Sequence, residues 1–521
     1  MKNGSWQVLN ADALPKGRKL VKLVWVYKVK RSGKLKARLC VQGCSQMPGV
    51  DYDQTHCSTM RGSTLRALSA LAAEQGLRMH RWDFVAAYLQ GELLENEHVY
   101  CHMPPGYETL GPDGRPQILK VVKPVYGMAQ AGRRWQRTLY PWLESQGFTR
   151  CHHDSNVFDL RKTVTLPNGK KRSERLTLGV YVDDLFTLYS HDDEHSLYST
   201  FISSLNDRWK VEDEGEVSDL LGIEISRSGS SVILKQTGYI DKLVAKWFPD
   251  APPATSVYNK VPADHTLPTL VADALSAKDE PSTSDVRSFQ SLVGALLYLA
   301  NTRPDIAYPV GYLCRAMGRP SPNLHAAGLR VLEYLYRTRN LGLTYESSPT
   351  PLYGHSDSDW AEKHSTSGHV FMYSKAAISW ASAKQPCVAL SSCEAEIMAL
   401  SEAAKEALHL RGLYEELGVS DGKPIKLSTD NTAARDLAYN PEYHKRVKHI
   451  ARRHFFVREC VENFQIEVPY VNTVDNLADF LTKAQPPKTF FAMRDEIMNV
   501  PRSQRSTDGS VDGGVLNDGL E

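Results

Sequence analysis

The stretch Leu176–Ser190, LTLGVYVDDLFTLYS, places two consecutive acids between two apolar runs. Both runs are rich in β-branched and aromatic residues, which favour β-strands. We therefore expect a β-hairpin with Asp183 and Asp184 at its tip. Asp is common in turns, so a turn alone would explain the pair, although Asp-Asp lacks the glycine that two-residue hairpin turns prefer.

A third acid lies upstream in RWDFVAAYLQGEL, residues 81–93. Asp83 stands at the end of a short predicted strand that leads into a helical or turn segment. Taken alone, such an Asp is typical of a helix cap. Phosphoryl transfer by two divalent ions, however, needs several carboxylates around ions about 3.5–4 Å apart, and hard oxygen ligands suit Mg²⁺. We therefore group Asp83 with Asp183 and Asp184 as candidate metal ligands.

A second group of acids begins after Tyr353. The pattern predicts a strand carrying Asp357, strands at GHVFMYS and AISWAS, and a helix over 391–417. Ser391 and Glu394 have the spacing of a capping box, and Gly418 stands in the usual stop position.

Glu396 falls in the middle of the apolar stripe of that helix, whereas Glu394 falls outside it. A carboxylate on a core-facing stripe is costly unless it is paired or bound to metal. We therefore interpret Glu396 as the ligand and Glu394 as the cap, with a partly exposed Glu396 as the alternative.

Two further acids follow. Asp430 stands between a strand and a helix in IKLSTDNTAARDLAY, where a plain helix N-cap would also suffice, and Asp479 lies in a helical turn of VDNLADFLTK, where a surface Asp is the alternative. Asp359 competes with Asp357 for the first position, because residues two apart share a strand face. We prefer Asp357.

The composition excludes several classes of protein. The chain has 521 residues, 42% of them hydrophobic, with a net charge of +2, which excludes general disorder and suggests about three domains of roughly 150 residues. No apolar run approaches the ~18 residues of a membrane span, and the start lacks a secretory signal, so we expect an intracellular, soluble protein without membrane contact. Nine cysteines without a C-x-x-C pair argue against disulfides and zinc.

Three stretches depart from this average composition. Residues 16–38 carry ten Lys/Arg and no acid, which predicts a hairpin with basic residues on one side, facing either a polyanion or solvent. Residues 249–284 are rich in Pro, Ala, Ser, Thr and Asp and predict a linker or long loop, and residues 502–521 predict a disordered tail.

The chain resembles the polymerase of copia-type long-terminal-repeat retrotransposons over almost its whole length. The shared order of many short motifs carries this resemblance: KNGSWQVL, KARLCVQGCSQMPGVDYDQT, WDFVAAYLQGEL, VYCHMPPGY, KPVYGMAQAGRRW, GVYVDD, LLGIEI, LVGALLYLANTRPDIAY and ALSSCEAEIMAL.

The resemblance implies a reverse transcriptase site in which Asp83, Asp183 and Asp184 bind metal. It further implies contacts to the incoming nucleotide: Arg38, assisted by Lys36, on the triphosphate, the Phe84 carbonyl as a further oxygen, Tyr88 under the sugar as an obstruction to a 2′-hydroxyl, and Gln130 on the nucleotide or template.

The motifs SDSDW, SSCEAEIMAL, STDNTAA and NLADFLTK resemble those of copia-type ribonuclease H and imply that Asp357, Glu396, Asp430 and Asp479 bind metal there. The run HKRVKHIARRH lacks the ligand spacing of a zinc site. Its basic residues predict phosphate contacts to the hybrid duplex, with a solvated helix face as the alternative: Lys445, Arg446, Lys448, Arg452 and Arg453.

Three features depart from the family pattern. Residues 58–61, STMR, replace the usual Pro-Val-Val-Arg, and Glu212 replaces a common Lys, which puts local loop geometry and a general-acid contribution near Glu212 in doubt. Met1 falls just before a family motif, so we expect a fragment without the protease and integrase found upstream in full polyproteins.

Together these predictions give an α/β (α+β) chain: a right-hand polymerase followed by a ribonuclease H-like domain. The expected boundaries are 1–250 for fingers and palm, 251–348 for thumb or connection with a linker at 250–285, 349–488 for ribonuclease H, and 489–521 for a tail.

The implied function is RNA- and DNA-templated DNA synthesis with cleavage of RNA in hybrids, using Mg²⁺, two per site, or Mn²⁺. The implied partners are an RNA template, a DNA primer, RNA–DNA hybrid, deoxynucleoside triphosphates and the element's integrase and capsid proteins, in a cytoplasmic particle or the nucleus. The sequence does not determine the oligomeric state. The alternatives are a catalytically decayed element and a domesticated nucleic-acid-binding protein, although all seven acids are present.

Overall fold

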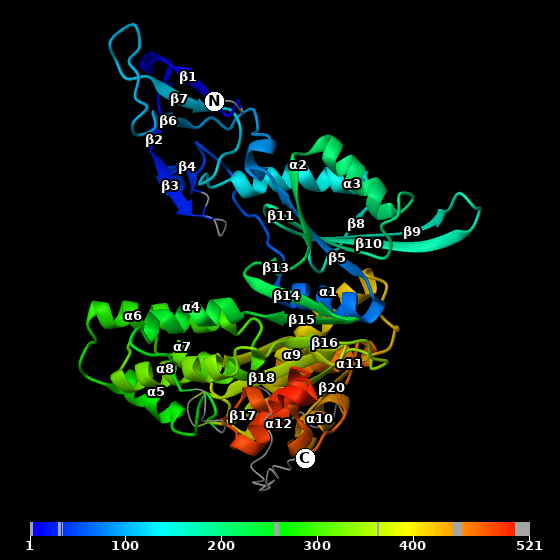
Figure 1. Ribbon diagram of the computed structural model, residues 1–521. Coiled ribbons are helices and arrows are strands. Elements are labelled where there is room, and N and C mark those ends of the chain that lie inside the picture. The colour runs from blue at the N-terminus through cyan, green and yellow to red at the C-terminus, as the bar shows by residue number, and fades with distance from the viewer. Residues whose placement is uncertain are drawn as a thin grey trace, which may run out of the picture. The chain divides into compact units, whose positions relative to one another are not determined.

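The computed structural model describes residues 4–29, 33, 35–254, 260–361, 364–440 and 451–505, without the side chains of 451, 452 and 454. The chain folds into two compact units (Figure 1). Unit 1 comprises residues 1–61 and 78–217, and unit 2 comprises 62–77 and 218–521.

The centre of unit 1 is an antiparallel six-stranded sheet in the order β12-β5-β11-β10-β9-β8. Helices α2 and α3 cover one face, because alternate side chains of β5, β10 and β11 pack against them in one core. The bounds are β5 Arg78–Phe84, β8 Thr149–Arg150, β9 Val157–Thr165, β10 Lys171–Tyr181, β11 Asp184–Tyr189, β12 Val211–Glu216, α2 Ala131–Ser145 and α3 Leu197–Arg208.

The N-terminal part of unit 1 adds a four-stranded sheet, β1-β7-β6-β2, and a separate hairpin, β3–β4. In the hairpin, Lys28 pairs with Lys36 and Val26 with Arg38, so these basic residues share one face, as expected. The bounds are β1 Trp6–Leu9, β2 Leu20–Val21, β3 Leu23–Val29, β4 Leu35–Val41, β6 Tyr100–His102 and β7 Ile118–Val121.

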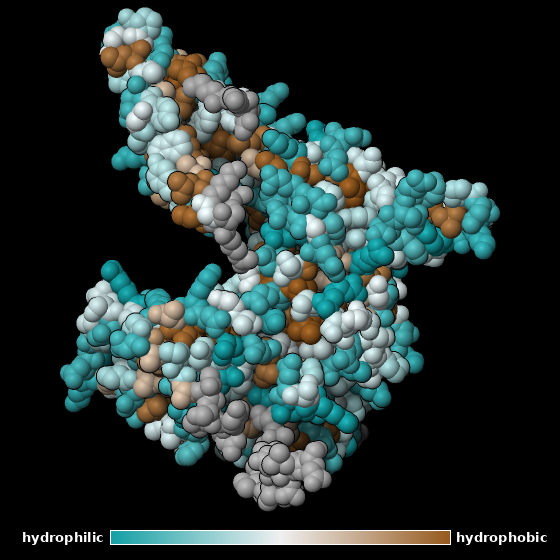
Figure 2. Space-filling view, in the orientation of Figure 1, coloured by the Kyte–Doolittle hydropathy of each residue, from teal (hydrophilic) through white to brown (hydrophobic). Residues whose placement is uncertain are grey.

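The β9–β10 hairpin projects from the sheet as a cyan-green arm in Figure 1. Its surface is largely hydrophilic (Figure 2), and its outer residues, from Lys162 to Arg172, are mostly exposed. The other end of β10 leads into the turn that carries Asp183.

Unit 2 begins with α1 and a sheet in the order β13-β14-β15-β16, beside a group of helices. The stretch 250–285, expected to be a linker, contains helix α5, because Leu267, Val271 and Ala274 bury one face at helical spacing. The bounds are α1 Gly62–Gln75, β13 Asp219–Leu220, β14 Ile223–Ser228, β15 Ser231–Lys235, β16 Leu343–Tyr345, α4 Thr237–Trp247, α5 Leu267–Ser276, α6 Thr283–Leu299, α7 Ala307–Cys314 and α8 Pro322–Arg337.

The last part of unit 2 is a five-stranded sheet in the order β19-β18-β17-β20-β21, with β17, β20 and β21 parallel. Helix α9 packs on β17 and β18. The bounds are β17 Tyr353–Asp359, β18 Thr366–Tyr373, β19 Ala376–Lys384, β20 Ile425–Ser428, β21 Ile466–Glu467, α9 Ser392–Glu416, α10 Thr432–Tyr439, α11 Ala451–Glu462, the 3₁₀ helix η8 Leu477–Leu481 and α12 Pro487–Ile497.

The expected α+β class is confirmed: a part built on an antiparallel sheet is followed by a five-stranded sheet with an antiparallel β-meander and two further parallel strands. The tail expected from residue 489 starts inside α12, and residues 506–521 lie outside the described chain. No helix in the described ranges is long and apolar enough to cross a bilayer.

Candidate active sites

The first carboxylate group forms where β5 and β11 pair. Asp83 lies directly opposite Asp184 in the antiparallel register, and the backbone N–H of Phe84 donates to the Asp183 carbonyl at 2.8 Å. Trp82 and Phe84 belong to the core under α2 and α3. Because side chains alternate along a strand, Asp83 and Asp184 lie on the opposite face of the sheet.

The hairpin is confirmed, with one correction: its two-residue turn is Val182-Asp183, because Asp184 already pairs with Tyr181 at the start of β11. A helix contact holds this turn in place. Val182 has φ +56°, a conformation uncommon for a β-branched residue. Its carbonyl accepts a hydrogen bond from Nε1 of Trp135 on α2 at 2.7 Å. This contact stabilises a turn that has no glycine and thereby fixes the backbone beside Asp183.

The first group concentrates negative charge. Burial raises the pKa of Asp83 to about 6, and the charges of Asp184 and Asp183 add to that effect. Burial also raises the pKa of Asp183, against the hydrogen bond from Tyr126. Asp184 is partly neutralised, because Nε and Nη2 of Arg81 lie 2.9 and 2.8 Å from its Oδ1.

The oxygens of Asp183 fit a hard divalent cation. Its Oδ2 accepts a hydrogen bond from the Tyr126 hydroxyl at 2.9 Å, whereas its Oδ1 is buried and has no partner in the described part of the chain. A buried polar atom without a partner is costly, and a divalent cation coordinated by carboxylate oxygens would supply one.

Three of the predicted nucleotide contacts gather near Asp183. Arg38 and Lys36 lie on one face of β4, and both lower the pKa of Asp183. The Arg38 guanidinium sits 4.7 Å from the ring centroid of Tyr126, and the Tyr88 ring lies 4.7 Å from the same ring. Burial, with the charge of Asp183, raises the pKa of Tyr88 to about 12.

Gln130 is placed differently from the expectation. Its side chain is fully buried, its Nε2 donates to the Asp51 carbonyl at 3.1 Å, and its Oε1 accepts from Gln46 at 3.2 Å. An amide with both ends bonded inside the protein supports the start of α2, so this placement offers no support for a nucleotide contact. The Phe84 ring packs 4.9 Å from Trp135, which leaves only its backbone carbonyl as a candidate ligand.

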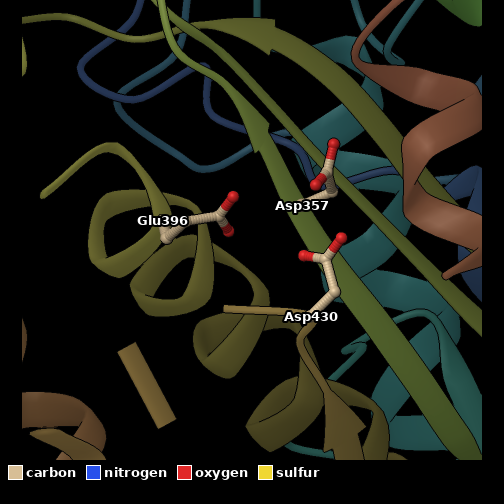
Figure 3. Close-up of side chains that lie close together, drawn as sticks. All are labelled: Asp357, Glu396 and Asp430. Atoms are coloured by element: carbon tan, nitrogen blue, oxygen red, sulfur yellow. The ribbon is translucent and has the colours of Figure 1, made fainter. Parts of the chain in front are cut away.

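The second carboxylate group brings together a strand, a helix and a loop. Asp357 lies on β17, Glu396 on α9, and Asp430 just after β20. Because β17 and β20 are parallel, with His355 beside Ser428, their carboxyl ends meet at one edge. One oxygen of each acid lies within 4.8 Å of the others, and Figure 3 shows the three carboxylates converging.

Asp479 approaches the same place from η8. The segment can lie against β18 because Gly368, opposite Asp357 in the register, has no side chain: a Cβ there would stand 2.7 Å from Cγ2 of Thr482. The Thr482 hydroxyl donates to Oδ2 of Asp357. Nζ of Lys483 lies 2.8 Å from Oδ2 of Asp479. Asp479 therefore lies near Asp357, but its carboxylate is paired with the ammonium group of Lys483.

The second group also carries perturbed acids. Burial raises the pKa of Glu396 to about 9, with added repulsion from Asp357 and Asp430. Burial and the charge of Asp479 raise the pKa of Asp357 to about 7. Oε2 of Glu396 is buried and has no hydrogen-bond partner within the described ranges. The carboxylate oxygens of Glu396 and Asp357, like those of Asp183, therefore fit a hard divalent cation.

Three alternative interpretations can now be judged. Asn431, not Asp430, caps α10, since its Oδ1 accepts from Ala434 N–H at 2.9 Å. No helix starts at Asp83, because the following 3₁₀ helix, η3 Ala87–Gln90, has Ala86 at its N-cap. Glu396 is not a partly exposed residue, because only 7% of it is accessible.

The predicted cap of α9 is confirmed, with one correction. The Ser391 hydroxyl accepts from Glu394 N–H at 3.2 Å, and Glu394 Oε2 accepts from Leu390 N–H at 2.6 Å. Glu394, expected outside the apolar stripe, is nevertheless buried, because this bond draws its carboxylate back over the helix start. Asp359 is partly buried and stands outside the converging group.

The basic run is only partly visible. Lys445, Arg446 and Lys448 lie outside the described residues, as does the side chain of Arg452. Arg453 lies on α11, with Nη1 4.0 Å from Sγ of Cys387. Its predicted phosphate contact stays a prediction.

Sequence reasoning missed four residues that contact the proposed ligands: Arg81, Tyr126, Thr482 and Lys483. Arg81 stands two residues before Asp83 and therefore on the same strand face, and Lys483 is four residues after Asp479. Both spacings could have indicated a contact. Tyr126 lies in a loop far from Asp183 in sequence, and nothing in its local pattern indicates the contact.

Comparison with known proteins agrees with this arrangement. Residues 3–253 match the family described as reverse transcriptase (RNA-dependent DNA polymerase). The retrovirus-related Pol polyprotein from transposon TNT 1-94 of Nicotiana tabacum is 31% identical over 507 residues, covering 94% of this chain and 36% of the relative. That from transposon RE1 of Arabidopsis thaliana is 33% identical over 475 residues, covering 90% and 31%.

Residues 3–253 therefore match the reverse transcriptase family, and at least 90% of the chain is similar to Pol polyproteins of copia-type retrotransposons. The chain spans about a third of the length of these curated relatives. The chain is also similar to a foamy viral protease-reverse transcriptase solved with an RNA/DNA hybrid, at 12% identity and a TM-score of 0.47, over 90% of this chain and 52% of the other.

Proposed function

We propose that this chain is an RNA- and DNA-templated DNA polymerase that also cleaves the RNA strand of RNA–DNA hybrids. The observation that carries the proposal is the placement of Asp83, Asp183 and Asp184 at one end of a single sheet, within the segment that matches the reverse transcriptase family. The convergence of Asp357, Glu396 and Asp430 supports the second activity.

In the polymerase site, each residue acts through its position. Asp83, Asp183 and Asp184 would hold the divalent cations at the end of the sheet where the primer and the nucleotide react. Arg38, assisted by Lys36, binds the triphosphate, since cationic groups offset the charge of a phosphoryl group during transfer. Tyr88 lies beneath the sugar and obstructs a 2′-hydroxyl.

In the second site, Glu396 and Asp357 would hold a cation in their ionised forms, although burial alone favours their neutral forms. Asp430 and Asp479 complete the oxygen set, and Lys483 holds Asp479 in place. Divalent ions, Mg²⁺ with Mn²⁺ as an alternative, supply charge neutralisation and an activated oxygen nucleophile when bound at these sites.

The substrates that follow are an RNA or DNA template, a DNA primer, RNA–DNA hybrid and deoxynucleoside triphosphates. We assign residues 1–250 to fingers and palm, 251–348 to a thumb or connection, and 349–488 to ribonuclease H. The element's integrase and capsid proteins are the proposed protein partners, in a cytoplasmic particle or the nucleus.

The test uses the purified full chain with Mg²⁺, deoxynucleotides and a DNA primer on an RNA template. The proposal predicts primer extension and, separately, shortening of a labelled RNA strand within a hybrid. Binding of the hybrid without either reaction would instead favour a decayed element that only binds nucleic acid.

A further inference from the structure

Tyr126 contacts three residues that the proposed polymerase uses. It lies in the loop between β7 and α2, and its hydroxyl donates to Oδ2 of Asp183 at 2.9 Å. The Arg38 guanidinium lies 4.7 Å from its ring centroid, and the Tyr88 ring packs against it at 4.7 Å. One side chain therefore contacts the proposed metal ligand, the triphosphate-binding cation and the sugar-selecting ring.

The backbone of Tyr126 is fixed to the strand that carries Arg38. Val41, the last residue of β4, donates its N–H to the Tyr126 carbonyl at 2.8 Å. The next residue, Gly127, has φ +88°, and a Cβ there would stand 2.1 Å from the Val41 carbonyl oxygen. Only glycine fits this close approach, so the loop lies directly against β4.

The two oxygens of Asp183 are in different environments. The Tyr126 hydroxyl holds Oδ2, whereas Oδ1 is buried without a partner within the described ranges. A hydrogen bond to one oxygen limits rotation of the carboxylate and keeps the other oxygen available. Residues that orient a metal ligand in this way commonly change metal affinity or activity by about 10–100-fold when mutated.

We propose that Tyr126 is a positioning residue with two separable parts: its hydroxyl orients Asp183 toward the metal, and its ring supports Tyr88 and Arg38. This inference rests on the proposed polymerase function. The ring of Tyr126 gives Tyr88 a fixed surface to pack against, and it places Arg38 by a cation–π contact. A purely space-filling role would need the ring alone.

Two substitutions separate these parts. Tyr126→Phe keeps the ring and removes the hydroxyl, so we expect the Mg²⁺ concentration for half-maximal extension to rise about 10-fold. The KM for deoxynucleotide and the discrimination against ribonucleotide should stay at the wild-type values. Tyr126→Ala should raise that KM and reduce that discrimination as well. Tyr107→Phe, at an exposed tyrosine of the same unit, is the matched control and should change none of these.

A binding measurement makes the test independent of catalysis. The full-length protein carries Glu396→Gln, which removes one ligand of the second site. The concentration of free Mn²⁺ is measured by electron paramagnetic resonance during a titration. Tyr126→Phe should weaken Mn²⁺ binding about 10-fold, as judged against the same protein with Tyr126.

Unchanged Mn²⁺ affinity and Mg²⁺ dependence in Tyr126→Phe would overturn the orienting role of the hydroxyl. A folded Tyr126→Ala protein with wild-type KM and sugar discrimination would overturn the supporting role of the ring. Failure of the wild type to extend primers would instead contradict the proposed function, while the Mn²⁺ titration would still decide the role of the hydroxyl.

Discussion

Replacement of Glu396 by Gln should stabilise the metal-free protein while it eliminates RNA cleavage. Glu396 is 7% exposed, and burial beside Asp357 and Asp430 raises its pKa from 4.5 to about 9. A group with a raised folded-state pKa contributes stability that is fully present below pH 4.5 and is lost as the pH rises through about 9. Glutamine is nearly isosteric and never ionises.

The size of the effect follows from the linkage between protonation and folding. Each pH unit between 4.5 and 7 costs the folded protein about 1.4 kcal/mol, so Glu396→Gln should increase the free energy of unfolding by about 3 kcal/mol at pH 7. The difference should vanish at pH 4.5 and grow toward pH 9. Mg²⁺ should stabilise the wild type more than the variant, because binding to the folded state adds to its stability and the variant lacks one ligand of the second site.

Glu394→Gln is the matched control, two residues earlier on the same helix and also buried. An amide oxygen can keep the hydrogen bond from Leu390 N–H, so any cost should stay within the ~1 kcal/mol of a typical cap. Cleavage of labelled RNA in a hybrid should persist in Glu394→Gln and disappear in Glu396→Gln, with primer extension unchanged in both.

The assay is urea unfolding with a metal chelator at pH 4.5, 7 and 9, together with hybrid cleavage in Mg²⁺. Equal stabilities of Glu396→Gln and wild type at pH 7 would refute the argument from buried charge. Cleavage that survives in Glu396→Gln but is lost in Glu394→Gln would show that the roles of the two carboxylates are reversed.

Three further predictions concern the polymerase site. Asp183→Asn should reduce primer extension on the order of 10²–10³-fold, the loss typical of removing one electrostatic group, with hybrid cleavage intact; retained extension in the folded variant would contradict its role as a ligand. Tyr88→Ala should reduce discrimination against ribonucleotides by up to about 100-fold, measured as the ratio of kcat/KM values, and an unchanged ratio would exclude the steric role. Arg81→Ala removes a charge that lowers the pKa of Asp83, so the acidic limb of the extension profile should move to higher pH, and a limb that stays in place would show that Asp83 does not govern it.

Local sequence pattern was sufficient to predict the structure wherever residues close together in the sequence determine it. The hairpin around Asp183 was predictable from two apolar runs, and the start and stop of α9 were predictable from Ser391 and Gly418. The order of Asp357, Glu396 and Asp430 along strand, helix and loop was predictable as well. In each case periodicity and capping chemistry report which face or end a residue occupies.

Contacts between distant segments were not predictable in this way. Tyr126 reaches Asp183 only because its loop packs on β4, and Gln130 is buried by partners at Gln46 and Asp51. Glu394 lies outside the apolar stripe of α9 yet is buried by its own capping bond. Helical periodicity says nothing about side chains that turn back over a helix end or meet across loops.

The most direct test of the two-site account is one reaction that reads both activities. A labelled RNA template annealed to a differently labelled DNA primer is incubated with Mg²⁺, deoxynucleotides and wild type, Asp183→Asn or Asp357→Asn protein. We predict extension with RNA cleavage for the wild type, cleavage alone for Asp183→Asn, and extension alone for Asp357→Asn. Loss of both activities in either folded variant, or neither activity in the wild type, would contradict the assignment of two independent catalytic sites.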